Sequence, residues 1–332
     1  MIITRTPFRV SFFGGGTDYP TWFRLNGGEV LSATIDKYCR ISVRSLPPFF
    51  EHKHRIVYSK IECVGKLDEI AHPSVREVLR WSGNTEGLEI HHDGDLPARS
   101  GLGSSSAFTV GLLHALAAQE GKFVSKSYLA TNAINIEQNI IKENVGSQDQ
   151  VAVSYGGLNH IKFNRDETFS VSPVTIPTSR LHELEDHLLL FFTGITRIAS
   201  ETAAKKIQNI PNKTEELKLL HQHVAKSLEI LHSGRAIEDF GEMMNDTWRV
   251  KRQLAEGVTN PIIDKIYSAA KQAGAIGGKI IGAGGGGFML VFAEPKYHKS
   301  IRNSLSNLVH VPFKFENEGS KVIVFQPEDS YT

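Results

Sequence analysis

The chain has 332 residues, of which 40% are hydrophobic and 22% are charged, and its formal net charge is +1 at pH 7. This composition is typical of a folded globular protein and excludes the collagen-like, low-complexity and disordered classes. The length favours two domains. The balanced charge gives no general attraction for nucleic acid or for an anionic membrane, so an anionic ligand would need a local site.

The N-terminal sequence and the cysteines indicate where in the cell the protein is expected to be. The opening residues have no signal-peptide pattern, and no apolar run reaches the roughly 20 residues that span a bilayer. Cys39 and Cys63 form no C-x-x-C pair, so we expect free thiols in a cytoplasmic protein. The 14 histidines show no zinc-binding spacing, which favours surface histidines without a metal.

The first half of the chain is expected to contain mostly strands and two long helices. Alternating apolar residues predict strands at 3–12, 28–46, 54–59 and 87–97. Helices are expected at 72–83, 104–120 and 126–143. The segment "VAVSYGGLNHIKF" (151–163) reads as two strands joined by a Gly-Gly turn.

A polar segment with prolines, 165–185, is the expected domain boundary. It divides the chain into an N-terminal domain, 1–175, and a C-terminal domain, 176–332. The second domain opens with the apolar strand "LLLFFTGI" (188–195). Its expected helices are 199–208, 213–232, 235–255, 260–274 and 295–308, with further strands in "GGKIIGAGGGGFMLVF" and "KVIVFQ".

Three glycine-rich stretches are candidates for ligand binding. The segment "GAGGGG" (282–287) matches G-x-G-x-x-G, but the strand "FMLVF" follows it. A dinucleotide fingerprint requires a helix at that place, so a nicotinamide oxidoreductase is disfavoured. Four consecutive glycines instead indicate a loop pressed against a ligand or another backbone.

The segment "FFGGGTDYP" (12–20) has two interpretations. It can be an ordinary turn, or the glycines and Asp18 can bind sugar hydroxyls through backbone groups and a carboxylate. The segment "SGLGSSSAF" (100–108) precedes an apolar helix and is not a Walker A loop, since no Gly-Lys-Ser/Thr occurs. Its glycines and the helix start favour a phosphate cradle over a simple serine-capped helix.

Together, in this order, these stretches resemble the GHMP kinase family. The resemblance rests on "RTPFRVSFFGGGTDYP" (5–20), "LPARSGLGSSSAF" (96–108), "ENVGSQDQVAVSYGG" (143–157) and "KIIGAGGGGFMLVF" (279–292). It implies a mixed α/β fold, with an N-terminal domain like ribosomal protein S5 and a ferredoxin-like C-terminal domain. ATP and substrate would meet between the two domains, and Mg²⁺ would accompany ATP.

The resemblance also implies residue roles. Asp149 falls at the catalytic aspartate and Arg9 at the arginine beside it, while Ser105 and Glu137 fall at the magnesium ligands, with Glu143 as a rival to Glu137. The expected nucleotide contacts are Pro97, Ser100, Gly101, Leu102, Gly103, Ser104, Ser105, Ser106 and Ala107. The expected substrate contacts are Gly15, Gly16, Thr17, Asp18, Tyr19, Arg197, Gly284 and Gly285.

Within the family, "SFFGGGTDYP" is most similar to the bacterial D-glycero-D-manno-heptose 7-phosphate kinase branch. Gly15 and Gly16 stand where galactokinases have Glu-His, which disfavours plain galactose. We therefore expect a small-molecule sugar phosphate as partner, neither nucleic acid nor membrane, and leave a homodimer open. Arg197 is expected to bind the phosphate of the sugar, and Ser200, three residues further along the chain, could add a hydroxyl or backbone donors. The alternatives are a fucose- or galactose-type kinase and a catalytically silent ATP and sugar sensor.

Overall fold

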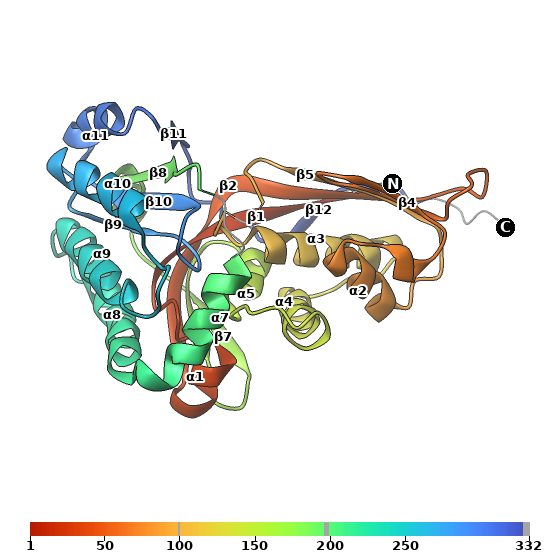
Figure 1. Cartoon of the computed structure of the whole chain (residues 1–332), viewed down its shortest axis with the longest axis horizontal. Coiled ribbons are helices and arrows are strands. Elements are labelled where there is room, and N and C mark those ends of the chain that lie inside the picture. The colour runs from red at the N-terminus through yellow and green to blue at the C-terminus, as the bar shows by residue number, and fades with distance from the viewer. Residues whose placement is uncertain (99, 196–198, 328–332) are drawn as a thin grey trace.

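The computed structural model describes residues 1–98, 100–195 and 199–327. The chain forms a mixed α/β structure in which two sheets lie end to end, each with its own helices (Figure 1). Within the described ranges, no helix combines the length and the apolar character that a membrane-spanning segment needs. Cys39 is buried, Cys63 is exposed, and both are free thiols as predicted.

The larger sheet has eight strands among the described residues, ordered β12-β1-β2-β5-β3-β4, with β6 and β7 branching from β2. Its strands are β1 (Ile2–Phe13), β2 (Gly28–Ser45), β3 (His54–Val57), β4 (Ile61–Val64), β5 (Leu88–Gly94), β6 (Leu158–Phe163), β7 (Phe169–Pro173) and β12 (Lys321–Phe325). The helices of this half are α1 (Pro20–Asn26), α2 (Pro73–Ser82), α3 (Ser104–Gln119), α4 (Lys126–Asn135) and α5 (Gln148–Tyr155).

The smaller sheet is antiparallel and has the order β11-β8-β10-β9. Its strands are β8 (Leu188–Phe192), β9 (Gly277–Ile280), β10 (Phe288–Phe292) and β11 (Val309–His310). The helices of this half are α6 (Thr178–Asp186), α7 (Ala199–Asn209), α8 (Thr214–His232), α9 (Glu238–Lys251), α10 (Pro261–Gln272) and α11 (His298–Ser304). The expected helix at 295–308 is thus shorter than predicted.

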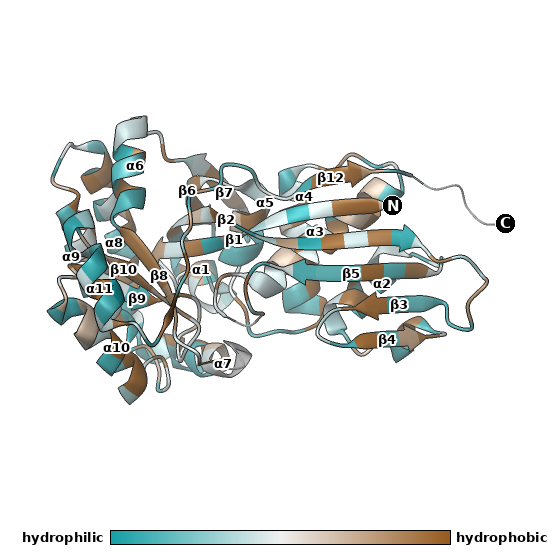
Figure 2. Ribbon diagram, turned by 90° about the horizontal axis from the view of Figure 1, so that it is seen from above, coloured by the Kyte–Doolittle hydropathy of each residue, from teal (hydrophilic) through white to brown (hydrophobic). Residues whose placement is uncertain are grey.

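Where β3, β4 and β5 lie, helices cover one face of the larger sheet. Helices α2, α3 and α4 lie on the same side of it, and Figure 2 shows the strands β5, β3 and β4 uncovered when the molecule is viewed from above. The first residues of β1 accordingly alternate between buried and half-buried, whereas residues 6–13 are all buried. Because α3 packs on one side of β1 while α8 and α9 approach it as well, the end of β1 that carries the first glycine loop is enclosed.

The prediction of a strand over residues 151–155 was wrong. Residues Gln148–Tyr155 form the helix α5, which ends at Gly156, and only Leu158–Phe163 is a strand. Val151, Ala152 and Val153 are all buried. A short apolar run that is buried all round carries no period that distinguishes a helix from a strand.

The assignment of all residues from 176 to 332 to one C-terminal domain also needs correction. The last strand, β12, pairs with β1 in the larger sheet, and Phe315 bridges to Ile35. The chain therefore returns to its first domain before it ends. Its final strand covers an edge of β1 that would otherwise present unpaired backbone groups.

Candidate active site

The glycine-rich stretches meet at the junction of the two sheets. The loop at 100–103 and the loop at 281–287 pack backbone against backbone: a Cβ on Gly101 would lie 2.5 Å from the Ile281 carbonyl oxygen, and one on Gly282 would lie 2.6 Å from Cα of Gly101. Only residues without a side chain permit this approach. The third glycine loop is thus pressed against another backbone, one of the two outcomes that the sequence predicted.

The second glycine loop leads into α3. Gly101 and Gly103 have φ of 85° and 76°, a conformation that glycine adopts without strain. Gly103, rather than a serine, is the N-cap of α3, because its carbonyl accepts from the N–H of Ala107 at 2.8 Å. The first N–H groups of a helix have no intrahelical partner, and the helix dipole adds partial positive charge. This end of α3 therefore suits a phosphate group.

Arg9 and Asp149 form a bidentate ion pair beside this helix end. Arg9 donates from Nε to Oδ1 at 2.9 Å and from Nη2 to Oδ2 at 2.7 Å, and its Nη1 donates to the Gly101 carbonyl at 2.6 Å. Gly103 lies against both side chains. Arg9 is 2% exposed while the Asp149 side chain is 16% exposed. The buried arginine thus fixes the carboxylate through two hydrogen bonds, and the exposed part of the Asp149 side chain remains accessible to a ligand.

Asp18 lies close to this pair and is 2% exposed. Its Oδ1 accepts from the N–H of Gly16 at 2.8 Å, and its backbone carbonyl accepts from the N–H of Ser147 at 2.9 Å. Burial raises the pKa of Asp18, the Gly16 N–H opposes this, and the Asp149 charge raises it further. Asp18 is thereby positioned as a hydrogen-bonding group near the Asp149 carboxylate.

Glu137 pairs with a serine of α3, but the serine is Ser106 and not the predicted Ser105. Ser106 Oγ donates to Glu137 Oε2 at 2.9 Å, whereas the Ser105 side chain is exposed. Glu137 is fully buried in a π-helical turn, Ile136–Ile140, that continues α4. Glu143, the alternative, is only half-buried, and its charge acts on Glu137 from nearby.

The Glu137–Ser106 pair fits a magnesium ion. Burial raises the pKa of Glu137 to about 8, with the Glu143 charge adding to the effect, and the buried Oε1 of Glu137 accepts no hydrogen bond from the described residues. No group of three or more acidic, histidine or cysteine side chains that could hold a metal occurs in the described part of the chain. A site of few protein oxygens is nevertheless typical of Mg²⁺, which completes its shell with water and phosphates.

Some of the predicted sugar-binding residues of the first glycine loop line a pocket, whereas Thr17 makes hydrogen bonds within the loop. Thr17 Oγ1 donates to the carbonyls of Gly14 and Glu29 at 2.8 and 2.9 Å, and Thr17 is 0% exposed. Its hydroxyl therefore fixes the turn, whereas the sequence predicts that Thr17 contacts the sugar. Gly16 and Tyr19 line a pocket. Gly15 lies near Gln148, the residue before Asp149.

Gly284 and Gly285 also differ from their predicted role. The Gly285 N–H donates to the Val258 carbonyl at 2.9 Å, and a Cβ on Gly284 would lie 2.8 Å from the same oxygen. Both glycines thus pack against the protein backbone at Val258. Pro97 is exposed, while Ser100 is buried with its Oγ unpartnered among the described residues.

The predicted phosphate-binding residue Arg197 lies outside the described residues, and nothing is described of the Ser200 side chain. Sequence reasoning missed three buried lysines at the junction, Lys206, Lys251 and Lys279. Lys279 is the first residue of the motif "KIIGAGGGGFMLVF" (279–292). A lysine in an otherwise apolar strand was the sequence feature that could have indicated a buried charge. Lys206 and Lys251 lie on amphipathic helices, where a lysine normally faces solvent.

Comparisons with known proteins agree with this geometry. The model "GHMP kinases N terminal domain" matches residues 69–157, and "GHMP kinases C terminal" matches residues 224–310. A D-glycero-alpha-D-manno-heptose 7-phosphate kinase of Campylobacter jejuni is 32% identical over 96% of this chain and 98% of its own. An L-fucokinase/L-fucose-1-P guanylyltransferase of Bacteroides fragilis is 28% identical over 91% of this chain and 36% of its own.

Solved structures share the fold. A D-glycero-D-manno-heptose 1-phosphate kinase from Bacteroides thetaiotaomicron covers 100% of both chains with a TM-score of 0.79 at 21% identity. A phosphomevalonate kinase from Streptococcus pneumoniae, in complex with phosphomevalonate and AMPPNP, covers 95% of this chain and 100% of its own with a TM-score of 0.76 at 18% identity. With both family domains matched and a relative similar over its whole length, the chain belongs to the GHMP kinase family.

Proposed function

We propose that this sugar kinase transfers the terminal phosphoryl group of ATP to the anomeric hydroxyl of D-glycero-D-manno-heptose 7-phosphate, giving the 1,7-bisphosphate and ADP. The observation that carries the kinase chemistry is the Arg9–Asp149 pair beside the start of α3. The whole-length similarity to a heptose 7-phosphate kinase supports the choice of acceptor.

The residues at the junction have distinct roles in this reaction. The loop 100–103 and the first turn of α3 hold the ATP phosphates through backbone N–H groups. Asp149 accepts the proton of the acceptor hydroxyl and orients it toward the terminal phosphorus. Arg9 fixes the Asp149 carboxylate through two hydrogen bonds and adds positive charge near the transferred group. Asp18 and its backbone neighbours orient the sugar.

Glu137 and Ser106 would hold the magnesium ion that accompanies ATP. Mg²⁺ neutralises charge on the phosphates during transfer. The carboxylate and hydroxyl oxygens of the pair are the ligand type that this ion prefers. Ser106 therefore replaces Ser105 as the serine that we assign to the metal.

A kinase for a neutral fucose-type sugar is the second candidate, because an L-fucokinase of Bacteroides fragilis is 28% identical over 91% of this chain. A catalytically silent sensor is disfavoured by the intact Arg9–Asp149 pair. The test is ADP release from the purified protein with ATP, Mg²⁺ and a panel of acceptors: heptose 7-phosphate, heptose, fucose and galactose. We expect the highest kcat/KM with heptose 7-phosphate. A preference for fucose or galactose would contradict the acceptor, and no turnover with any sugar would favour the sensor.

A further inference from the structure

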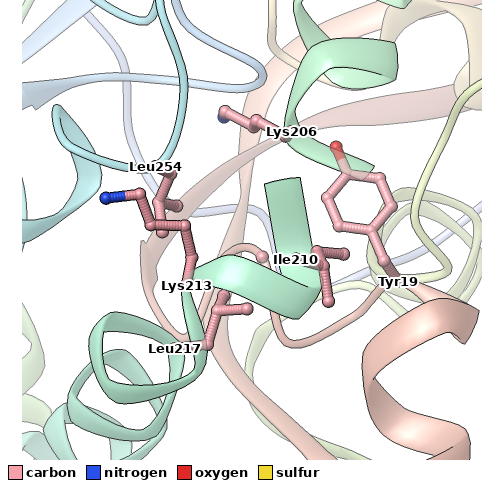
Figure 3. A pocket seen from close by; sticks show the side chains of 7 residues that line it. Tyr19, Lys206, Ile210, Lys213, Leu217 and Leu254 are labelled. Atoms are coloured by element: carbon pink, nitrogen blue, oxygen red, sulfur yellow. The ribbon is translucent and has the colours of Figure 1, made fainter. Parts of the chain in front are cut away.

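A buried lysine of α7 faces the pocket beside the first glycine loop. Lys206 is 6% exposed and lines this pocket together with Gly16, Tyr19, Ile210, Lys213, Leu217 and Leu254. In Figure 3 the Lys206 side chain extends from α7, and the Lys213 side chain extends from the start of α8. Lys213 Nζ donates a hydrogen bond to Glu216 Oε1 at 2.8 Å. The pocket therefore has one buried ammonium group, and apolar side chains form much of its wall.

Lys206 differs from the two other buried lysines in its partners. Lys251 donates to the carbonyls of Ile280 and Gly282 at 2.8 and 2.7 Å, and Lys279 donates to the carbonyl of Phe12 at 2.7 Å. Within the described residues, Lys206 has neither a hydrogen bond nor an ion pair of this kind. A buried cation without a partner is costly, so a ligand that supplies negative charge would remove the penalty.

The balance of charge at the junction points the same way. Among the described residues, four buried basic side chains, Arg9, Lys206, Lys251 and Lys279, lie near two carboxylates, Asp18 and Asp149. Burial lowers the pKa of Lys279 to about 7 and that of Lys251 well below its usual value, so these two lysines supply less positive charge than Lys206. Arg9 already pairs with Asp149. Asp18 alone remains for the three lysines, and burial lowers the pKa of Lys206 to about 8 against the opposing effect of the Asp18 charge. Lys206 thus lacks a full counter-charge from the protein, which an added anion would supply.

The position of the pocket indicates which anion it suits. Its lining includes Gly16 and Tyr19, which flank the Asp18 loop, but neither Arg9 nor Asp149 nor any residue of the 100–107 segment. The pocket is therefore distinct from the phosphate cradle of α3 and from the reacting groups. A charged group bound there would belong to a part of the acceptor remote from the hydroxyl that is phosphorylated.

We propose that Lys206 binds the phosphate that the acceptor sugar already carries, and that it makes the enzyme select a sugar phosphate over the neutral sugar. This inference rests on the proposed function and deepens it, because it assigns a residue to the recognition of the 7-phosphate. An ammonium group donates charge-assisted hydrogen bonds to phosphate oxygens. The apolar wall of the pocket strengthens such bonds by excluding water.

The test compares Lys206→Met with Lys205→Met, because Lys205 is the neighbouring lysine of α7 and is exposed. Steady-state kinetics are measured for ATP, for heptose 7-phosphate and for heptose without the phosphate. We expect Lys206→Met to raise KM for heptose 7-phosphate about 10- to 100-fold, the loss that a hydrogen bond to a charged group predicts, while KM for ATP stays within about twofold. Lys205→Met should behave like the wild type, and Lys206→Arg should recover part of the loss.

The decisive readout is the ratio of kcat/KM for heptose 7-phosphate to that for heptose. We expect this ratio to fall in Lys206→Met, and also in Lys206→Gln, a second variant in case the first is recovered unfolded. A wild type that prefers the sugar phosphate and a Lys206 variant with an unchanged ratio would overturn this inference and leave the proposed function standing. A wild type that prefers neutral sugars would overturn the proposed function itself.

Discussion

The charged side chains of the larger sheet and those at the junction of the two sheets are balanced in different ways. On the sheet, Glu89 is 3% exposed but accepts hydrogen bonds from His91, Arg44 and Arg55. Burial alone would raise the pKa of Glu89, but these partners lower it to about 2. The carboxylate is thus fully compensated by the protein.

At the junction the compensation is incomplete. Burial raises the pKa of Glu137 to about 8 and lowers that of Lys206 to about 8. One buried oxygen of Glu137 accepts no hydrogen bond from the described residues, and the Lys206 side chain is 6% exposed and lines a pocket. Groups with shifted pKa values are common at functional sites, because a bound ligand supplies the counter-charge or hydrogen bonds that the protein does not provide. The comparison therefore separates charges that the protein itself compensates from charges that, in our proposals, a substrate or a metal compensates.

The largest expected effect comes from Asp149→Asn. The amide can still accept one hydrogen bond from Arg9 but cannot accept the proton of the acceptor hydroxyl, so kcat should fall about 10²- to 10⁴-fold. Single-turnover assays and ATP binding measured by calorimetry check this, with ATP affinity expected near that of the wild type. A loss of kcat smaller than a few-fold would show that Asp149 does not perform this role.

The next effect is expected from Glu137→Gln, which removes the charge available to the metal. The Mg²⁺ concentration that gives half-maximal activity should rise about 10- to 100-fold, and Ser106→Ala should shift it in the same direction. Magnesium titrations of kcat/KM for ATP measure this. Glu143→Gln and Ser105→Ala are the matched controls, and a larger shift in either control than in its partner would move the metal site.

Gly101→Ala tests the contact that brings the two halves of the site together. Its Cβ would meet the Ile281 carbonyl at 2.5 Å in a backbone with φ of 85°, so we expect a loss of about 1–3 kcal/mol in the free energy of unfolding. Gly121→Ala is the control, because Gly121 also has a positive φ but nothing lies within 4 Å of its added Cβ. Equal losses in urea unfolding of the two variants would mean that backbone strain, and not the contact, matters.

Glu89→Gln should have the smallest effect, visible as a change in the pH dependence of stability. Because the pKa of Glu89 is lowered from 4.5 to about 2 in the folded protein, its contribution is present above pH 4.5 and is lost as the pH falls toward 2. The variant should be less stable than the wild type near neutral pH, and the difference should shrink at acid pH, with kcat unaffected. Urea unfolding at several pH values measures this, and the exposed Glu86→Gln is the control. A difference that did not change with pH would contradict the assignment.

The sequence by itself determined much of the site. The spacing of glycines and serines in 100–108 predicted an anion-binding helix start, and α3 begins at Ser104 as expected. The resemblance to GHMP kinases placed Arg9 and Asp149 together, and the structure joins them by two hydrogen bonds. These features are local, or they follow from a motif order that covers nearly the whole chain.

Tertiary structure decided the rest, because it depends on which side of an element faces the junction. Ser105 and Ser106 are adjacent in the sequence, but successive residues of a helix point about 100° apart, so only the packing of α3 decided that Ser106 meets Glu137. Lys206 sits in an ordinary amphipathic helix, and its burial appears only once α7 is packed beside the Asp18 loop. The return of β12 to β1 joins residues more than 300 positions apart, a pairing that local pattern cannot encode.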